Sequence, residues 1–337
     1  MTPGGHLIPL RELGQIDKQF PKKCGWQVKV CTPSRIFSET YKNMEKILKR
    51  GDMVGIAASS SPFDKKQFQK GINSLKKMGF KVFYHFHIFS KENYLAGDDQ
   101  RRSKELLALF KNKKVKAILF ARGGYGAQRI IPLLDPKILK KNRKPVVGVS
   151  DITALLTFLR QKAGIPTFYG PVVTQLGNDV SLTNLSLKSA LTEPQKNKPI
   201  SLKNCKIMQS GLAHGKLVGG CLSLITSSIG TPYDLDTRNS ILFFEDVDEK
   251  VYAVDRMLTQ LKNSGKLNGV KGILIGTLKP VRGEKHSMEV MLKNTLKNFK
   301  GPIVTHFPAG HTKKFVTLPL GAKITLDTSL LCDNLKK

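Results

Sequence analysis

The sequence is short of acidic residues, tryptophan, cysteine and long apolar runs, and most of these shortages exclude a class of protein. Five cysteines form an odd set without C-x-x-C spacing, so neither a zinc site nor a complete disulfide framework is indicated, and we expect reduced thiols. No apolar run approaches the roughly 18 residues of a membrane span, and the N-terminus lacks the charged and apolar regions of a signal peptide. We therefore expect no membrane span and a cytoplasmic protein, or a periplasmic one if the N-terminus is longer or processed.

Basic residues are abundant instead. The 56 Lys and Arg residues exceed the 25 Asp and Glu residues, which gives a formal net charge of +31 at pH 7. They are spread through nearly every segment, with few interleaved aromatics and no recognition motif, so we expect no specific nucleic-acid partner. A solvated basic surface is the simpler interpretation, and it favours contact with polyanionic material such as cell-wall polymers.

Apolar runs and amphipathic segments alternate along the chain. Buried-strand patterns over 52–58, 81–87 and 115–121 are separated by helical patterns, and another strand and helix follow around residue 150. Such repeats predict an α/β fold with a mostly parallel N-terminal sheet and flanking helices. A binding crevice is then expected at the carboxyl ends of its strands. Strand patterns at 241–245, 272–276, 302–306 and 323–326 predict a smaller C-terminal α/β domain.

The composition suggests where the domains begin and end. A length of 337 residues with 40% hydrophobic content favours two domains. We expect an N-terminal extension over 1–48 and an N-terminal domain over 49–173. A linker rich in Asn, Ser, Thr, Lys and Pro should span 174–205, before a C-terminal domain over 206–330.

Ser150 is the first candidate for a catalytic residue. The stretch 144–159 is an apolar strand pattern that breaks at Gly148 and continues as an amphipathic helix, with Ser150 at the break. A hydroxyl at such a turn projects from the sheet edge, where N–H groups of the helix start can stabilise an anion. This geometry suits a nucleophile. The alternative is that Ser150 or Asp151 only caps the helix, as these residue types often do.

A glycine-rich turn over 122–126 is expected on the same rim. Its Gly124-x-Gly126 spacing lacks a third glycine at position 129, which is Arg, and no G-K-[ST] follows, so a nucleotide site is weakly supported. Glycines at a strand end also let backbone N–H groups face a substrate closely, as an oxyanion hole requires.

Two residues of the C-terminal region could complete a nucleophilic triad. Glu245 ends a very apolar strand, where a carboxylate is costly without a partner. Glu249 lies three residues after Asp246, like the second half of a capping box, so we interpret Glu249 as structural. His311 follows a strand and can act as a base near neutral pH, although a lone loop histidine is more often an ordinary surface residue.

His85 and His87 face the same side of one predicted strand. No carboxylate or cysteine spacing supports them as metal ligands, so we interpret them as structural and expect no metal site.

Taken together, these stretches resemble the LD-carboxypeptidases, also called muramoyltetrapeptide carboxypeptidases, a family of serine peptidases. The resemblance covers about residues 50–328. Its most specific stretches are Tyr94–Gly97, Arg122–Ala127, Gly148–Leu155, Phe244–Glu249 with Tyr252, Asp255 and Arg256, and Gly310–His311 with Leu318–Gly321. Five motifs in the right order are hard to explain by chance.

The resemblance implies a triad of Ser150, His311 and Glu245, with the nucleophile in the N-terminal domain and its partners in the C-terminal one. It also implies an oxyanion hole formed by the backbone N–H groups of Asp151 and Gly124. No metal or organic cofactor is required. The expected partners are a peptidoglycan-derived tetrapeptide and a second copy of the chain in a homodimer.

The implied reaction is release of the terminal D-alanine from the L,D-bond of that tetrapeptide through an acyl-enzyme. We expect the glycine-rich turn to contact the substrate through Arg122, Gly123 and Tyr125. Because an exopeptidase must recognise a free carboxylate, Arg122 is a candidate for that contact, with a structural ion pair as the alternative.

The sequence also departs from the family pattern. Cys221 stands where the family usually has Asn after Gly-Gly, and the stretch after His311 is unusually basic. One alternative function is a microcin-type peptide-nucleotide immunity hydrolase of the same family, whose members stack the base on an aromatic residue, often Trp. The single tryptophan, Trp26, lies outside the matched region. A non-catalytic basic protein that binds cell wall or nucleic acid is the other alternative.

Overall fold

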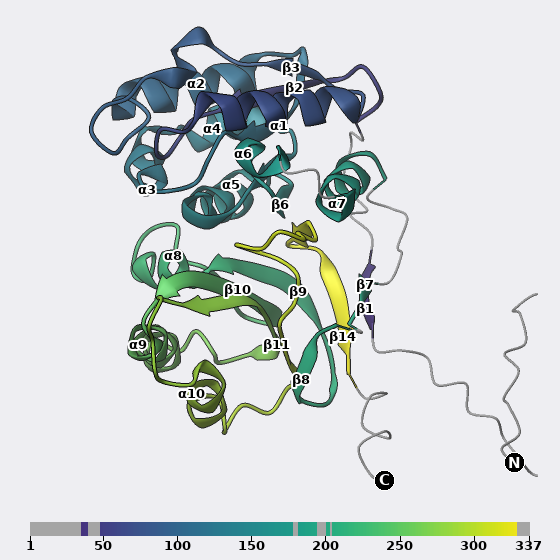
Figure 1. Cartoon of the computed structure of the whole chain (residues 1–337), viewed down its shortest axis with the longest axis vertical. Coiled ribbons are helices and arrows are strands. Elements are labelled where there is room, and N and C mark those ends of the chain that lie inside the picture. The colour runs from purple at the N-terminus through teal and green to yellow at the C-terminus, as the bar shows by residue number, and fades with distance from the viewer. Residues whose placement is uncertain (1–34, 40–47, 178–180, 194–199, 203, 329–337) are drawn as a thin grey trace, which may run out of the picture. The chain divides into compact units, whose positions relative to one another are not determined.

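The computed structural model describes residues 35–39, 48–177, 181–193, 200–202 and 204–328. In these ranges the chain forms two mixed α/β sheets with flanking helices, so the predicted fold class is confirmed (Figure 1). None of the helices in the same ranges is both long enough and apolar enough to cross a membrane.

The N-terminal sheet has the strand order β13-β6-β5-β4-β2-β3 among its described strands. Neighbouring strands from β6 to β3 are parallel, and β13 is antiparallel to β6. The sheet is therefore mostly parallel, as predicted. Its strands are β2 (Met53–Ala57), β3 (Lys81–Phe83), β4 (Val115–Phe120), β5 (Val146–Gly148), β6 (Thr167–Tyr169) and β13 (Leu318–Leu320).

Helices flank this sheet, and several begin at an aspartate. Asp64 and Asp98 each accept a hydrogen bond from a backbone N–H of the first turn, which satisfies a donor that the helix itself leaves unpaired. The helices are α1 (Lys65–Lys77), α2 (Asp99–Lys111), α3 (Ala127–Ile130), α4 (Pro136–Lys141), α5 (Thr153–Ala163), α6 (Val173–Leu176) and α7 (Ser181–Thr192). Short 3₁₀ helices cover Phe86–Phe89, Ile131–Leu133 and Ser150–Ile152.

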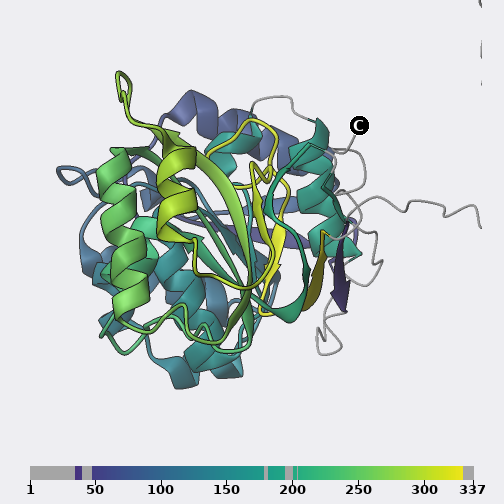
Figure 2. The ribbon, with the colours of Figure 1, turned by 90° about the horizontal axis from the view of Figure 1, so that it is seen from below.

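The second sheet has the described strand order β7-β1-β14-β9-β10-β11-β12-β8. Its central strands from β9 to β12 are parallel. The strands are β1 (Arg35–Glu39), β7 (Ile200–Ser201), β8 (Lys206–Gln209), β9 (Leu212–Cys221), β10 (Ser240–Glu249), β11 (Val270–Pro280), β12 (Ile303–Thr305) and β14 (Lys323–Asp327). Figure 2 shows helices α9 (Val251–Asn263) and α10 (Met288–Thr295) side by side across one face, and α8 is Leu222–Ser227.

Apolar side chains of β10 alternate between two cores. Leu242 and Phe244 pack with α8, α9 and α10, whereas Ile241 and Phe243 belong to a core that also contains side chains of the N-terminal sheet. Successive residues of a strand point to opposite faces. Glu245, two residues after Phe243, therefore faces the N-terminal sheet.

Three short strands pair with strands from other predicted segments of the chain. Within the predicted extension, β1 pairs with β14, and within the predicted linker, β7 pairs with β1. Strand β13, from the C-terminal region, pairs with β6 of the N-terminal sheet. The remainder of the extension lies outside the described residues, and the domain boundaries themselves stay a prediction.

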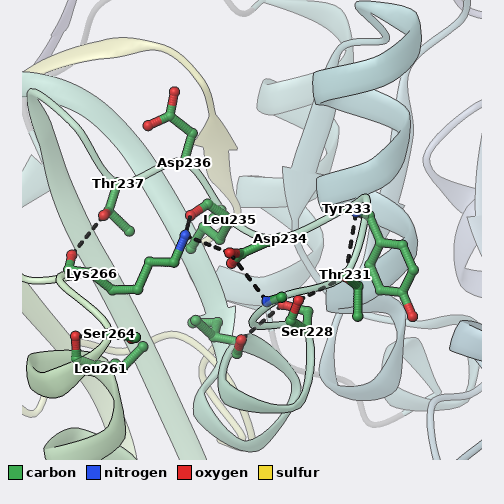
Figure 3. Close-up of polar contacts among 12 residues, drawn as sticks. Ser228, Thr231, Tyr233, Asp234, Leu235, Asp236, Thr237, Leu261, Ser264 and Lys266 are labelled. Carbon is green, nitrogen blue, oxygen red and sulfur yellow. Dashed lines mark hydrogen bonds and ion pairs between the residues drawn. The ribbon is translucent and has the colours of Figure 1, made fainter.

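A loop between α8 and β10 connects the two sheets through helix α5. Lys266 anchors this loop, since its ammonium lies 2.7 Å from an Asp234 carboxylate oxygen and donates to the Leu235 carbonyl at 3.0 Å (Figure 3). Gln161 of α5 donates to the Asp234 carbonyl at 2.8 Å and accepts from the Asp236 N–H at 2.9 Å. The helix that follows Ser150 is thereby tied to the C-terminal region.

Candidate active site

Ser150 lies two residues after the end of β5, at a strained turn. Its φ is +63°, a left-handed value that is unfavourable for a side chain with a Cβ atom. Neither Ser150 nor Asp151 caps the helix that follows it through its side chain, because the start of that helix has no side-chain capping bond. The capping alternative is thus not what the structure contains. A strained serine between a strand and a helix has the backbone form of a nucleophile elbow.

The glycine-rich turn lies against Ser150. A Cβ atom placed on Gly123 would stand 3.2 Å from the Ser150 hydroxyl, so only a glycine leaves that hydroxyl open on this side. Gly124 has a φ of +112° and is packed against Ser61. In the described part of the chain, no acceptor takes the N–H of Gly124 or of Asp151. These are the two donors that we expect in the oxyanion hole.

The carboxylate of Asp151 fixes the turn relative to Ser150. It is buried and accepts hydrogen bonds from the Ser60 hydroxyl at 2.5 Å and the Ala127 N–H at 2.8 Å. Burial raises the pKa of Asp151, while these donors oppose the shift. Three consecutive strands of the sheet, β2, β4 and β5, are therefore joined at their carboxyl ends by one side chain.

A buried arginine, Arg102, also forms hydrogen bonds with the backbone of the glycine-rich turn. Arg102 of α2 donates to the carbonyl oxygens of Ser59, Gly97 and Gly126, and it pairs with Asp99. Sequence reasoning did not identify Arg102, Ser60 or the side-chain role of Asp151. In the sequence, the serines after β2 indicated only where that strand ends.

Glu245 and His311 form the second half of the site. The imidazole Nδ1 lies 2.8 Å from Glu245 Oε2, which also accepts the His311 backbone N–H at 3.1 Å. The Glu245 side chain is fully buried, whereas 28% of the His311 side chain is exposed. The carboxylate therefore sets the ring orientation and leaves Nε2 as the ring nitrogen that can act on a substrate.

Glycines make room for this carboxylate. Gly310 has a φ of +102°, and a Cβ atom there would overlap the Glu245 carboxyl group. At Gly276 of β11, a Cβ atom would stand 2.5 Å from the Ala309 carbonyl oxygen and 2.9 Å from Glu245 Cβ. The close approach of the 309–311 backbone to β10 and β11 thus requires glycine at both positions.

Tyr169 connects the two halves, and sequence reasoning missed it. Its hydroxyl donates to Glu245 Oε1 at 2.5 Å and accepts the Ser150 N–H at 3.2 Å. The available signal was a tyrosine ending a buried apolar strand, because a buried phenol needs a polar partner. No hydrogen bond joins the Ser150 hydroxyl to His311 among the described residues; such bonds often tighten only when substrate binds.

The pKa of His311 is raised above its ordinary value. Burial by itself lowers this pKa, but the hydrogen bond and negative charge of Glu245 raise it, helped by the charges of Asp246 and Asp248. The imidazolium form, which a general base acquires when it takes a proton, is therefore favoured at this position.

A cavity of about 850 Å³ lies beside His311, along β11 and the carboxyl end of β12. Basic residues on its wall are Lys206, Lys313 and Lys314. Its apolar lining includes Met208, Ile275, Leu278, Met288 and Leu292. Ser150 does not line it, so the cavity extends from the histidine side of the site.

The predicted substrate contacts lie on the glycine-rich turn. Arg122 is exposed, donates to the Pro62 carbonyl at 2.7 Å and forms no ion pair with a described residue. Tyr125 is 52% exposed, and its ring meets that of Tyr94 edge-on at 5.6 Å between centroids. Gly123 is buried against Ser150.

Two local interpretations were wrong. Asp246 and Glu249 both lie within β10, and α9 begins only at Val251, so they form no capping box. The Asp246 carboxylate instead accepts the Ser223 N–H at 2.8 Å. The predicted strand over 81–87 ends at Phe83 as β3, so its two histidines do not share a strand face. Across the described residues, no three His, Cys, Asp or Glu side chains form a group that could hold a metal ion.

Fold and site together define a two-domain α/β protein in which a strained serine, a buried carboxylate and a histidine belong to one hydrogen-bonded network. The chain matches the family models of the LD-carboxypeptidase N-terminal domain over residues 54–170 and of the C-terminal domain over residues 214–326. It therefore belongs to the LD-carboxypeptidase family and is a peptidase of that family.

Curated relatives agree with this assignment. The chain is 38% identical over 301 residues to the probable murein peptide carboxypeptidase of Bacillus subtilis (strain 168), covering 87% of this chain and 94% of the relative. It is 30% identical over 271 residues to the murein tetrapeptide carboxypeptidase of Pseudomonas aeruginosa, covering 74% and 85%.

Solved structures share the fold. The wild-type apo form of the microcin C7 self-immunity protein MccF has a TM-score of 0.76 and 27% identity, covering 84% of this chain and 97% of that one. The muramoyltetrapeptide carboxypeptidase of Oxalobacter formigenes has a TM-score of 0.71 and 27% identity, covering 82% and 99%.

Proposed function

We propose that the chain is a serine carboxypeptidase that releases the terminal D-alanine from the L,D-bond of peptidoglycan tetrapeptides. The observation that carries this proposal is the hydrogen-bonded pair of Glu245 and His311, linked through Tyr169 to the strained Ser150. The names of the murein carboxypeptidase relatives support the substrate class.

In the proposed reaction, His311 takes the proton of the Ser150 hydroxyl while Glu245 stabilises the imidazolium. The hydroxyl oxygen attacks the carbonyl carbon that precedes the terminal D-alanine. The N–H groups of Gly124 and Asp151, which have no other acceptor among the described residues, hold the oxyanion. His311 then protonates the leaving amine, and water hydrolyses the acyl-enzyme with the same base.

Two features suit the rest of the substrate. The exposed guanidinium of Arg122 forms no ion pair with a described carboxylate, which supports our proposal that it binds the terminal carboxylate. The cavity beside His311 is large enough for several peptide residues, and Lys313 and Lys314 on its wall suit the carboxylates of a stem peptide, whereas Lys206 is paired with Glu289 of the same wall. Recognition of the free terminal carboxylate makes the enzyme an exopeptidase.

Mass spectrometry of muropeptides before and after incubation with the protein tests this function. Muramoyl tetrapeptide should lose D-alanine, while pentapeptide, L-Ala-terminated and C-terminally amidated tetrapeptides should remain largely intact. Ser150→Ala and His311→Ala should each lower kcat by several orders of magnitude. Equal cleavage of the amidated and free peptides would contradict the carboxylate recognition, and EDTA-sensitive turnover in Ser150→Ala would contradict the serine mechanism.

A peptide-nucleotide hydrolase is the second candidate. The chain is 28% identical over 312 residues to the microcin C7 self-immunity protein MccF of Escherichia coli, and MccF has been solved in complex with glutamyl sulfamoyl guanosine. Incubation with that compound beside the muropeptides separates the two candidates, since we expect the tetrapeptide to be the faster substrate.

The homodimer and the cytoplasmic location also remain proposals. Sedimentation velocity across a concentration series tests the first. Fractionation of cells that produce the full chain tests the second.

A further inference from the structure

Tyr169 lies at the point where the two sheets meet. It is the last residue of β6, its side chain is fully buried, and its ring packs against Phe243 at 5.2 Å and Phe315 at 6.0 Å between centroids. The hydroxyl contacts the backbone of Ser150 from the N-terminal sheet and the carboxylate of Glu245 from the C-terminal one.

The direction of both bonds is determined by chemistry. A backbone N–H can only donate, so the Tyr169 oxygen accepts from Ser150, and the single phenolic hydrogen is left for Glu245 Oε1. Burial, followed by the negative charge of Glu245, raises the pKa of Tyr169 well above its usual range. The phenol therefore keeps its proton and remains a donor to the carboxylate.

Glu245 depends on this donor. Its side chain is fully buried, and its oxygens accept from Tyr169 on one side and from two N–H groups of His311 on the other. A buried carboxylate oxygen without a donor would hold its negative charge poorly solvated, which makes the carboxylate a stronger base. The hydrogen bond from the Tyr169 hydroxyl thus stabilises part of the Glu245 negative charge, which would otherwise act on His311 alone.

We propose that Tyr169 is a positioning residue that ties the Ser150 backbone to Glu245 and withdraws part of the carboxylate charge from His311. The same bond occupies the Ser150 N–H, so the oxyanion donors must come from elsewhere on the turn, as the unpaired N–H groups of Gly124 and Asp151 do. The catalytic consequence rests on the proposed carboxypeptidase function, whereas the effect on His311 does not.

The test compares Tyr169→Phe with Tyr84→Phe. Tyr84 is a partly buried tyrosine packed on Phe68 and Phe89, and its hydroxyl makes no hydrogen bond with a described residue, so this control removes a phenol oxygen without breaking such a bond. On the tetrapeptide, Tyr169→Phe should lower kcat by about ten- to a hundredfold, the range expected for loss of a hydrogen bond to a charged group. KM should stay within about twofold, since the phenol does not reach the surface, and the control should match the wild type.

The second measurement needs no activity. The His311 ring is titrated by NMR in a Ser150→Ala background, and its resonances are assigned by their loss in His311→Gln. Removing the phenol leaves the negative charge of Glu245 to His311 alone, so Tyr169→Phe should move the His311 titration to higher pH, and Tyr84→Phe should leave it in place. If Tyr169→Phe does not fold, 3-fluorotyrosine at position 169 keeps the size but is a stronger donor, and it should move the titration to lower pH.

An unmoved His311 titration in the folded Tyr169→Phe protein would overturn the proposal, even if kcat fell. A lower melting temperature with unchanged kcat and titration would leave Tyr169 a packing residue and would overturn it as well. A moved titration in a protein that cleaves no tetrapeptide would uphold the role of Tyr169 and refute the proposed function instead.

Discussion

Substitution of Glu245 by Gln should cost less activity than loss of either other member of the proposed triad. The carboxamide has one acceptor oxygen and one NH₂ group, whereas Glu245 accepts one bond from Tyr169 and two from His311. Turning the oxygen towards His311 keeps both of those bonds, and the NH₂ group then donates to the Tyr169 oxygen. The Glu245→Gln protein therefore keeps the His311 tautomer with Nδ1–H directed at position 245.

The magnitude follows from the charge that is lost. A hydrogen bond to a charged group contributes about 1.5–3 kcal/mol, and about 1.4 kcal/mol corresponds to a factor of ten in rate. Glu245→Gln should then lower kcat by about 10- to 150-fold, against several orders of magnitude for Ser150→Ala. Because the negative charge that raises the pKa of His311 is gone, the acid limb of kcat/KM should move to lower pH.

The assay is D-alanine release from muramoyl tetrapeptide, measured by chromatography between about pH 5 and 9. Circular dichroism and a melting curve establish that the variant is folded. A loss of kcat as large as that of Ser150→Ala would mean that the His311 proton has moved from Nδ1 to Nε2. That result would refute the assigned orientation of the carboxamide. An acid limb that stays in place would refute the role of the Glu245 charge.

Three further predictions follow from the site and its surroundings. In the wild type, the acid limb of kcat/KM should lie above the ordinary histidine pKa of about 6.5, because the pKa of His311 is raised in the folded protein. Protonation of His311 therefore stabilises the folded state. This stability is fully present below the unfolded-state pKa and is lost as pH rises through the folded-state pKa. Gly310→Ala should lower kcat at least tenfold, because the added Cβ atom would displace Glu245. The control is Gly283→Ala, where φ is +84° but no neighbouring atom lies within 4 Å, so only the melting temperature should fall slightly. Equal kcat values for the two variants would refute the packing argument. Gln161→Ala removes two hydrogen bonds to the loop after α8 and should cost about 1–3 kcal/mol in denaturant unfolding with KM unchanged, an outcome that an unaltered unfolding midpoint would exclude.

Local patterns in the sequence were enough for much of the fold. The strands predicted over 52–58 and 115–121 are β2 (Met53–Ala57) and β4 (Val115–Phe120), because a short apolar run is a local property. The catalytic assignments rested on motifs, and the hydrogen bonds of Glu245 and His311 place two of those residues in contact. Their catalytic role stays a proposal.

Other features depend on contacts between distant segments. Asp246 and Glu249 have the spacing of a capping box, yet parallel pairing with β11 extends β10 through both, so sheet formation overrides the local signal. The serines after β2 and Arg102 act on a turn that is distant in sequence. Tyr169 could not be assigned either, because its partners lie 19 and 76 positions away along the chain.

The pairing of β13 with β6 bears on how the protein is made. Leu318 lies opposite Tyr169 in this pair, so the edge of the N-terminal sheet beside Tyr169 is completed by residues synthesised about 150 positions later. While the chain is still on the ribosome, β6 presents unpaired N–H and C=O groups, which is the kind of edge that aggregates or recruits a chaperone. The residues around Ser150 and Tyr169 also lack His311 until synthesis has passed that position. A nascent chain shorter than 311 residues therefore holds only part of the candidate site.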